Sequence, residues 1–149
     1  MSYDTTDLNS KPLTFFRFED LRIYHKALDY IFWVQKINQQ FPEDADKSLA
    51  HGYCDAARQI PLRIAEGSAR EKQQFVQYLK EAKSSIRSCL VYATLLHRHG
   101  FITDSEEEDS RNQLMEMTKM LGALITSLQK GSMTSQEQYD EDFYPSKNW

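Results

Sequence analysis

No proline occurs between Pro61 and Pro145, and this absence restricts the fold more than any other feature of the chain. A proline inside a helix costs about 3 kcal/mol, because it has no N–H to donate and its ring crowds the preceding turn. Apolar residues recur through the same stretch at spacings of three and four, which is typical of helices with one buried face. The sequence therefore predicts an all-α protein.

Four helices are expected, at about residues 18–40, 44–66, 69–97 and 104–130. Pro42 is expected to end the first, and Gly67, Gly100 and Gly131 are expected to close the other three. Gly67 suits the left-handed position after a helix C-terminus, where a side chain would clash. The short connections predict an up-down-up-down antiparallel four-helix bundle.

Two capping boxes are predicted at helix starts, Ser68 with Glu71 and Thr103 with Glu106. In such a box the hydroxyl oxygen accepts a bond from a free N–H of the first turn, and the glutamate reaches back to the cap. The first box places the start of the third helix near Ala69.

The chain has 149 residues and is 40% hydrophobic and 27% charged, as expected for one globular domain with its own core. The predicted bundle occupies residues 18–130. Residues 1–17 show no period and are expected to form a flexible N-terminal arm. Residues 131–149 are expected to form an acidic tail that contains aromatic residues.

The first predicted helix is apolar on two sides. One stripe consists of Leu21, Tyr24, Leu28, Ile31 and Gln35, and the other of Ile23, Tyr30, Trp33, Val34 and Ile37. A small monomeric core cannot take both stripes, and an exposed apolar strip of this width usually marks an interface. We therefore expect an oligomer whose interface contains Ile23, Tyr30, Trp33 and Ile37.

Pro61 lies inside the second predicted helix. The apolar spacing of Ala57, Ile60 and Ile64 carries through it, so the helix should continue and bend there. The bend either fits the helix to a curved neighbour, which is the structural interpretation, or shapes a binding groove.

Three stretches of the chain, FEDLRIYHKALDYI, FPEDADKSLAHGYCDAARQIPLRIAEGSAR and QFVQYLKEAKSSIRSCLVYATLL, resemble a known family. The family comprises the bacterial four-helix-bundle proteins encoded in 23S ribosomal RNA intervening sequences. The matching positions are Phe18 and Leu21, Phe41 and Pro42, residues 60–70 and residues 75–82. The resemblance covers about residues 18–130 and is most specific in the Ile-Ala-Glu-Gly block, so Pro61, Glu66 and Gly67 are interpreted as structural residues. The chain departs from the family in a shorter link after Gly67 and in its C-terminal tail.

The resemblance implies partners that the residues alone do not show. The family is related to the accessory variability determinant proteins of diversity-generating retroelements, which form barrel-shaped homopentamers with a basic surface. Those proteins bind the reverse transcriptase of the retroelement and nucleic acid. The resemblance therefore implies a homopentamer that binds RNA or DNA, a reverse transcriptase, or both.

A basic row on the third predicted helix is the concrete candidate for nucleic-acid binding. Lys80, Lys83, Arg87 and Arg98 fall within an arc of roughly 60°, at about 100° per residue. Arg63 and Arg70 could extend the row if the second and third helices are adjacent, and Glu66 is spaced for a local ion pair with Arg70. A row of this kind can neutralise phosphates. The alternative is that these bases are simply solvated or pair with acids such as Glu81.

Composition and motifs argue against other classes of function. The net charge of −4 excludes a wholesale polyanion binder, although the segment from Glu71 to His99 is mildly basic. His51 and Cys54 have no second pair of metal ligands at a comparable spacing, so no metal and no cofactor are expected. The chain contains neither a nucleophile motif nor a phosphate-binding glycine loop, so no enzymatic activity is expected.

No apolar run is long enough to span a membrane, no signal peptide is recognised, and Cys54 and Cys89 are expected to be buried thiols. A cytoplasmic protein is expected. The leading hypothesis is a non-enzymatic oligomeric adaptor that binds nucleic acid, a reverse transcriptase, or both, as the accessory protein of a diversity-generating retroelement does. The alternative hypothesis is a protein-interaction scaffold that binds no nucleic acid.

Overall fold

The computed structural model describes residues 14–130, so most of the predicted arm, the whole predicted tail and Gly131 lie outside the described residues. A short 3-10 turn, η1 (Arg17–Asp20), precedes four long helices. These are α2 (Arg22–Asn38), α3 (Lys47–Ser68), α4 (Lys72–Arg98) and α5 (Asp104–Gln129). The described residues contain no strand, and the prediction of an all-α four-helix bundle is confirmed.

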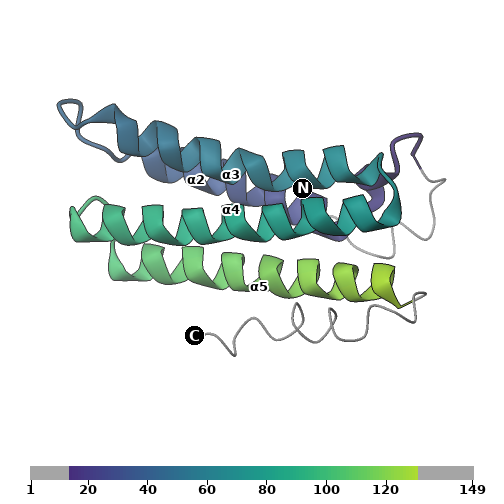
Figure 1. The fold of residues 1–149 in the computed structure, drawn as a ribbon. Coiled ribbons are helices and arrows are strands. Elements are labelled where there is room, and N and C mark those ends of the chain that lie inside the picture. Colours follow the sequence, from purple (N-terminus) through teal and green to yellow (C-terminus); the bar gives the residue numbers. More distant parts are fainter. Residues whose placement is uncertain (1–13, 131–149) are drawn as a thin grey trace.

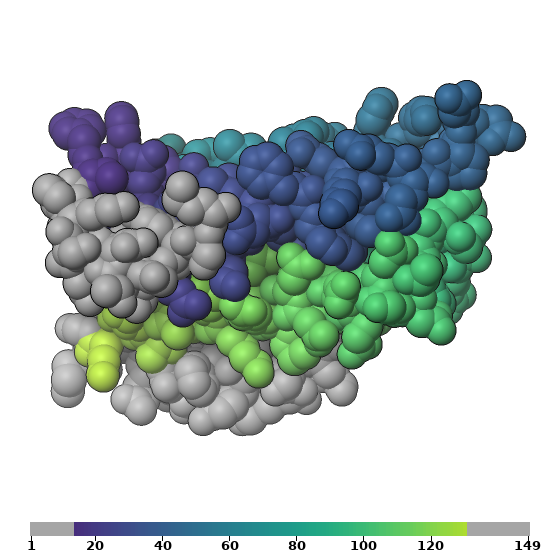
Figure 2. Space-filling view, turned by 180° about the vertical axis from the view of Figure 1, so that it is seen from behind, coloured from purple at the N-terminus to yellow at the C-terminus, as the bar shows by residue number. Residues whose placement is uncertain are grey.

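The four helices lie side by side and alternate in direction (Figure 1). The contact between α3 and α4 is the most extensive, and the contact between α2 and α5 is the least extensive of the four between neighbouring helices. Helix α4 therefore has α3 on one side and α5 on the other. Figure 2 shows the opposite side of the molecule, where α2 lies next to α5.

The core takes the apolar stripe of each helix. Its largest fully buried side chains come from all four helices and are Tyr30, Val34, Tyr53, Ile60, Ile64, Leu79, Ile86, Leu96, Leu114, Met117, Leu121 and Ile125. Burying one such side chain stabilises the fold by about 1.5–3 kcal/mol. The described helices therefore form a single core within one chain.

Helix α2 corrects the predicted oligomer interface. Ile23, Tyr30 and Ile37 are buried in the core of a single chain, and Trp33 is half-buried and stacks on Tyr30 with ring centroids 5.9 Å apart. The argument that these residues cannot share one small core was therefore wrong. The other predicted stripe is only partly covered, since Leu21 and Ile31 pack against the edge of the core and Leu28 is half-buried, whereas Phe32, which belongs to neither stripe, is 68% exposed.

Three hydroxyl groups form a closed ring inside this core. The Tyr30 hydroxyl lies 2.7 Å from that of Tyr53 and 2.8 Å from Ser110 Oγ, and the Tyr53 hydroxyl lies 3.2 Å from Ser110 Oγ. Each hydroxyl can donate one hydrogen bond and accept another, so the ring satisfies all three groups without water. It ties α2, α3 and α5 together in one register.

The junction between α3 and α4 differs from its prediction. Helix α3 continues through Gly67 to Ser68, and the Ser68 hydroxyl donates to the carbonyl of Ala65 at 2.8 Å. Glu71 is the N-cap of α4, with no side-chain capping bond. The capping box of Ser68 with Glu71 and the left-handed Gly67 were therefore both wrong.

The close packing of α4 accounts for Gly67. A Cβ at this position would lie 2.5 Å from Tyr78 Cβ, so the glycine allows α4 to approach the backbone of α3. Pro61 is buried within α3, and the helix continues across it as expected. The bend at Pro61 stays a prediction. Glu66, which was also interpreted as a structural residue, is exposed.

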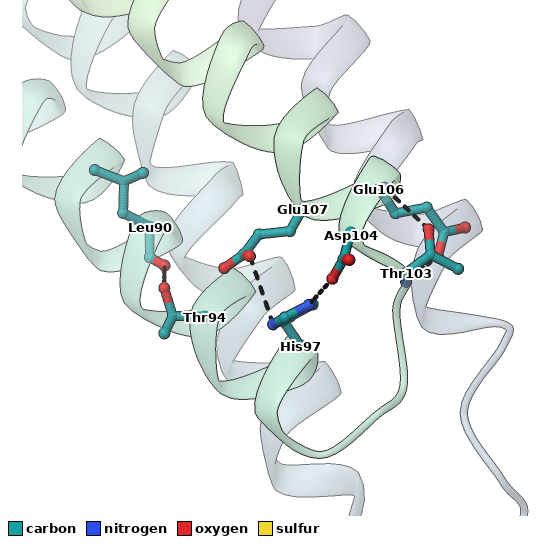
Figure 3. A network of polar contacts seen from close by, with 7 residues as sticks. All are labelled: Leu90, Thr94, His97, Thr103, Asp104, Glu106 and Glu107. Atoms are coloured by element: carbon teal, nitrogen blue, oxygen red, sulfur yellow. Dashed lines mark hydrogen bonds and ion pairs between the residues drawn. The ribbon is translucent and has the colours of Figure 1, made fainter.

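The junction between α4 and α5 follows its prediction. Gly100 has a φ of 78°, the left-handed conformation that favours glycine after a helix end. Thr103 Oγ1 accepts from the Glu106 N–H at 3.0 Å, and Glu106 Oε1 accepts from the Thr103 N–H at 2.9 Å. The second capping box is therefore confirmed (Figure 3).

Candidate nucleic-acid interface

Two of the six predicted binding residues lie on the α3 side of α4. Arg63 forms an ion pair with Glu81, with Nε and Oε1 3.5 Å apart. The guanidinium of Arg70 lies 5.6 Å from the centre of the Tyr78 ring, and within the described residues Arg70 forms no ion pair with Glu66. Tyr78 in turn packs on Gly67 of α3. Arg63 and Arg70 therefore do not extend the row of bases on α4.

The row itself lies on the other flank of α4. At 100° per residue, Lys83 is about 160° around the helix from Glu81, and Arg87 is about 120° from it. Lys80 and Lys83 are half-buried, and Arg87 is exposed. The residue one turn further on, Val91, is 60% exposed although it is apolar. Lys83 and Arg87 therefore lie on the side of α4 that adjoins α5, whereas Lys80 and Val91, about 100° and 80° around the helix from Glu81, point outward between the two flanks.

Helix α5 adds bases to the same surface. His97 of α4 contacts Asp104 and Glu107, so these two positions mark the side of α5 that faces α4 (Figure 3). Arg111 and Met115 continue this side at spacings of four, and Lys119 follows one turn later. Arg111 and Lys119 are exposed, and Met115 is 50% exposed.

The antiparallel register brings these side chains level with the row on α4. Because His97 is level with Asp104 and Glu107, Met115 is about level with Arg87 and Lys119 with Lys83, at a rise of about 1.5 Å per residue in both helices. We call this surface the α4/α5 face and define it by Lys80, Lys83, Arg87, Val91, Arg111, Met115 and Lys119.

Neither acid of these two helical segments lies on the α4/α5 face. Residues 80–91 of α4 contain one acid, Glu81, which pairs with Arg63 of α3. Residues 111–123 of α5 also contain one, Glu116, whose Oε1 lies 3.1 Å from Lys26 Nζ of α2. Glu81 thus lies on the α3 flank of α4, and Glu116 reaches toward α2 although it is only about 60° around α5 from Lys119, so the face is defined by five bases and neither of these acids.

Arg98 stands apart from this face. It is the last residue of α4 and lies next to the acidic first turn of α5, where His97 Nε2 is 2.5 Å from Asp104 Oδ1 and Nδ1 is 3.5 Å from Glu107 Oε1. A phosphate is disfavoured beside these carboxylates because like charges repel. Of the six predicted residues, the structure therefore brings together Lys80, Lys83 and Arg87.

Sequence reasoning missed Arg111 and Lys119. They were counted within an acidic segment, in which six acids outnumber three bases between Asp104 and Lys130. The signal that could have found them is their spacing. Each lies about one turn from Met115, whereas five of the six acids lie within residues 104–109.

The buried ionisable groups offer no activated nucleophile. Burial, together with a smaller effect of the nearby Cys54, raises the pKa of the Cys89 thiol to about 12, so Cys89 stays protonated at neutral pH. Burial likewise raises the pKa of Tyr53 to about 12. Cys54 and Cys89 form no disulfide in the described part of the chain. No three His, Cys, Asp or Glu side chains within residues 14–130 gather to hold a metal ion.

The fold and this surface define an antiparallel four-helix bundle with one basic face between two helices. Comparison with known families identifies the chain further. It matches the 23S rRNA-intervening sequence protein family over residues 19–123 and belongs to that family. A comparison with curated proteins finds no significant match. Within residues 14–130, none of the helices has both the length and the hydrophobicity that spanning a bilayer requires.

Proposed function

We propose that this protein is a non-enzymatic cytoplasmic adaptor that binds single-stranded RNA or DNA through the α4/α5 face. The observation that carries the proposal is the sorting of charge around α4 and α5. Five bases share one face, whereas Glu81 and Glu116 are held by Arg63 and Lys26 on other flanks. Bases therefore outnumber acids on this side of residues 80–91 and 111–123.

The expected mechanism is neutralisation of phosphates with release of counterions. If five bases each neutralise one phosphate of a single strand, log K should fall against log salt with a slope of about −3.5. Phosphate contacts position a nucleic acid without reading its bases. Any choice of nucleic-acid sequence would therefore come from a bound partner protein. Val91 and Met115 provide apolar surface beside the bases for an unstacked base.

A fluorescence titration with single-stranded RNA and DNA tests this, beginning at about 50 mM salt because the affinity should be greatest there. In the variant K80Q/K83Q/R87Q the affinity should fall about tenfold or more, and the slope should fall to about −1.4. The matched control is K36Q/K47Q/R58Q, which removes the same charge from exposed positions on α2 and α3. Binding that is undetectable, independent of salt, or weakened equally by both variants contradicts the proposal.

We further propose that the chain assembles into a homopentamer, as the family resemblance implies. The candidate interface is now the outward side of α2, because Phe32 is 68% exposed there and Leu28 is only partly covered. The variant L28S/F32S should reduce the mass measured by light scattering, whereas L62S, at an exposed leucine of α3, should leave it unchanged. A wild-type mass equal to one chain would refute assembly.

A reverse transcriptase is the proposed protein partner, and its support is the family resemblance. If this is correct, a reverse transcriptase encoded beside this gene should copurify with the protein when the two are produced together. Copurification without salt-dependent nucleic-acid binding would favour the second candidate function, a protein-interaction scaffold.

A further inference from the structure

The α4/α5 face combines two properties, a group of bases and exposed apolar side chains, that also suit an occupant other than a nucleic acid. It carries five bases, and it also exposes Val91 and Met115, which are 60% and 50% accessible. Exposed apolar side chains set among like charges fit a partner that is both acidic and aromatic. Such a partner would neutralise the bases and remove the apolar surface from water.

The chain itself contains a segment with this chemistry. Residues 131–149 hold four acids, Glu137, Asp140, Glu141 and Asp142, against one base, Lys147. The same segment holds Tyr139, Phe143, Tyr144 and Trp149. These residues lie outside the described range, and in sequence Tyr139 lies among the acids while the other three aromatic residues follow them.

The start of this segment places the α4/α5 face within reach. Helix α5 ends at Gln129, and because α4 and α5 are antiparallel this end lies beside the first turns of α4. Val76 lies in the second turn of α4, close to the end of α5, and from there to Arg87 the α4 axis rises about 16 Å, which is the distance that the tail must cover. The acids follow Lys130 by seven to twelve residues, and an extended chain of that length spans at most about 23–40 Å.

We propose that residues 137–149 dock on the α4/α5 face of their own chain, with the acids against the bases and the aromatic rings against Val91 and Met115. A tethered segment has an effective concentration in the millimolar range, so individually weak exposed ion pairs are sufficient to populate the docked state. The docking does not depend on the proposed function. If the face also binds nucleic acid, the tail competes with it.

Lysine acylation followed by mass spectrometry tests the docking in the full chain without nucleic acid. The variant E137Q/D140N/E141Q/D142N should acylate Lys80, Lys83 and Lys119 at least about twofold faster than the wild type, with Lys47 of α3 as the internal reference. The matched control E43Q/D44N/E66Q/D109N removes four exposed acids that lie away from the face and should leave all rates unchanged. Equal rates in the two variants would overturn the proposal.

Zero-length carbodiimide cross-linking identifies the occupant. In the wild type, tail carboxylates should join Lys80, Lys83 or Lys119, and 0.5 M salt should suppress these links. Mixing unlabelled with ¹⁵N-labelled protein distinguishes docking within one chain from docking on a second copy. Links that are absent, or that join one labelled and one unlabelled chain, would overturn the proposal.

A nucleic-acid titration separates this inference from the proposed function. If both hold, the tail variant should bind single-stranded RNA about two- to tenfold more tightly than the control variant. Tail cross-links in a protein that binds no RNA would leave the docking in place and refute the proposed function. RNA binding without tail cross-links would leave the proposed function in place and refute the docking.

Discussion

The two sides of helix α4 differ in what their residues do. On the α3 side, Tyr78 packs against Gly67, and Glu81 is paired with Arg63. On the α5 side, His97 near the C-terminal end of α4 contacts Asp104 and Glu107 of α5. Toward the N-terminal end of α4, the bases of the α4/α5 face lie at the surface. Because a helix turns 100° per residue, Lys80 and Glu81 are neighbours in sequence but belong to different surfaces. Counting charges along the sequence therefore cannot show which surface a charge serves.

The largest expected effect tests the close packing on the α3 side. In Gly67→Ala the new Cβ would lie 2.5 Å from Tyr78 Cβ, an atom attached directly to the backbone of α4 that cannot rotate away. The clash should cost about 3 kcal/mol, and the better helix propensity of alanine returns about 1 kcal/mol, so the free energy of unfolding should fall by about 2 kcal/mol. Urea unfolding measures it, and a stabilised variant would show that the two helices are not in close contact here.

A smaller effect is expected where α4 turns into α5. In Thr103→Ala the first turn of α5 loses the capping bond from Thr103 Oγ1 to the Glu106 N–H. Loss of an N-cap side chain should lower the free energy of unfolding by about 1 kcal/mol. Thermal unfolding compares it with Thr103→Ser, which keeps the hydroxyl and should stay within about 0.5 kcal/mol of the wild type. An equal loss in both variants would contradict the capping role.

A second glycine on the α3 side sharpens the comparison with Gly67. In Gly52→Ala the new Cβ would meet the Tyr92 hydroxyl at 2.3 Å, but this atom is the far end of a side chain that can turn. Relief of the clash and the gain of about 1 kcal/mol in helix propensity should leave the free energy of unfolding within about 0.5 kcal/mol of the wild type. If Gly52→Ala destabilises as much as Gly67→Ala, the stacked rings of Tyr92 and Tyr53 hold Tyr92 rigid.

The smallest expected effect depends on pH. The Thr103 N–H and the Gln40 amide both donate to the Glu106 carboxylate, and the backbone bond is the larger cause of its lowered pKa. A lowered pKa stabilises the fold above the ordinary value of 4.5, and this stabilisation is lost as the pH falls through the folded value. Glu106→Gln should therefore lose less stability than the wild type between about pH 5 and pH 3. Parallel unfolding curves at these pH values would contradict this.

Local signals in the sequence predicted the parts of the fold that local interactions control. The capping box of Thr103 with Glu106 was right because both of its bonds form within one turn. The predicted box of Ser68 with Glu71 was wrong because α3 continues through Gly67 to Ser68, so Ser68 is still inside α3 and cannot cap α4. At Gly67 the helix packs against Tyr78 and Phe75 of α4, a contact between helices that the local sequence does not reveal. Three of the six binding candidates, Lys80, Lys83 and Arg87, share the α4/α5 face, and Arg111 and Lys119 were missed because they come from another helix.

The sequence by itself determined the helical class, the number of helices and most of their limits, because the period of the apolar residues and the helix-end signals act within a few residues. Only the tertiary structure decided that Ile23, Tyr30 and Ile37 of α2 are buried in the core while Leu28 of the other stripe is only partly covered, since both stripes of α2 are apolar. It also decided that Glu81 pairs with Arg63 of α3 and Glu116 with Lys26 of α2. Which residues are buried and which charges pair depends on which helices pack against each other. That packing is determined by contacts between residues far apart in the chain.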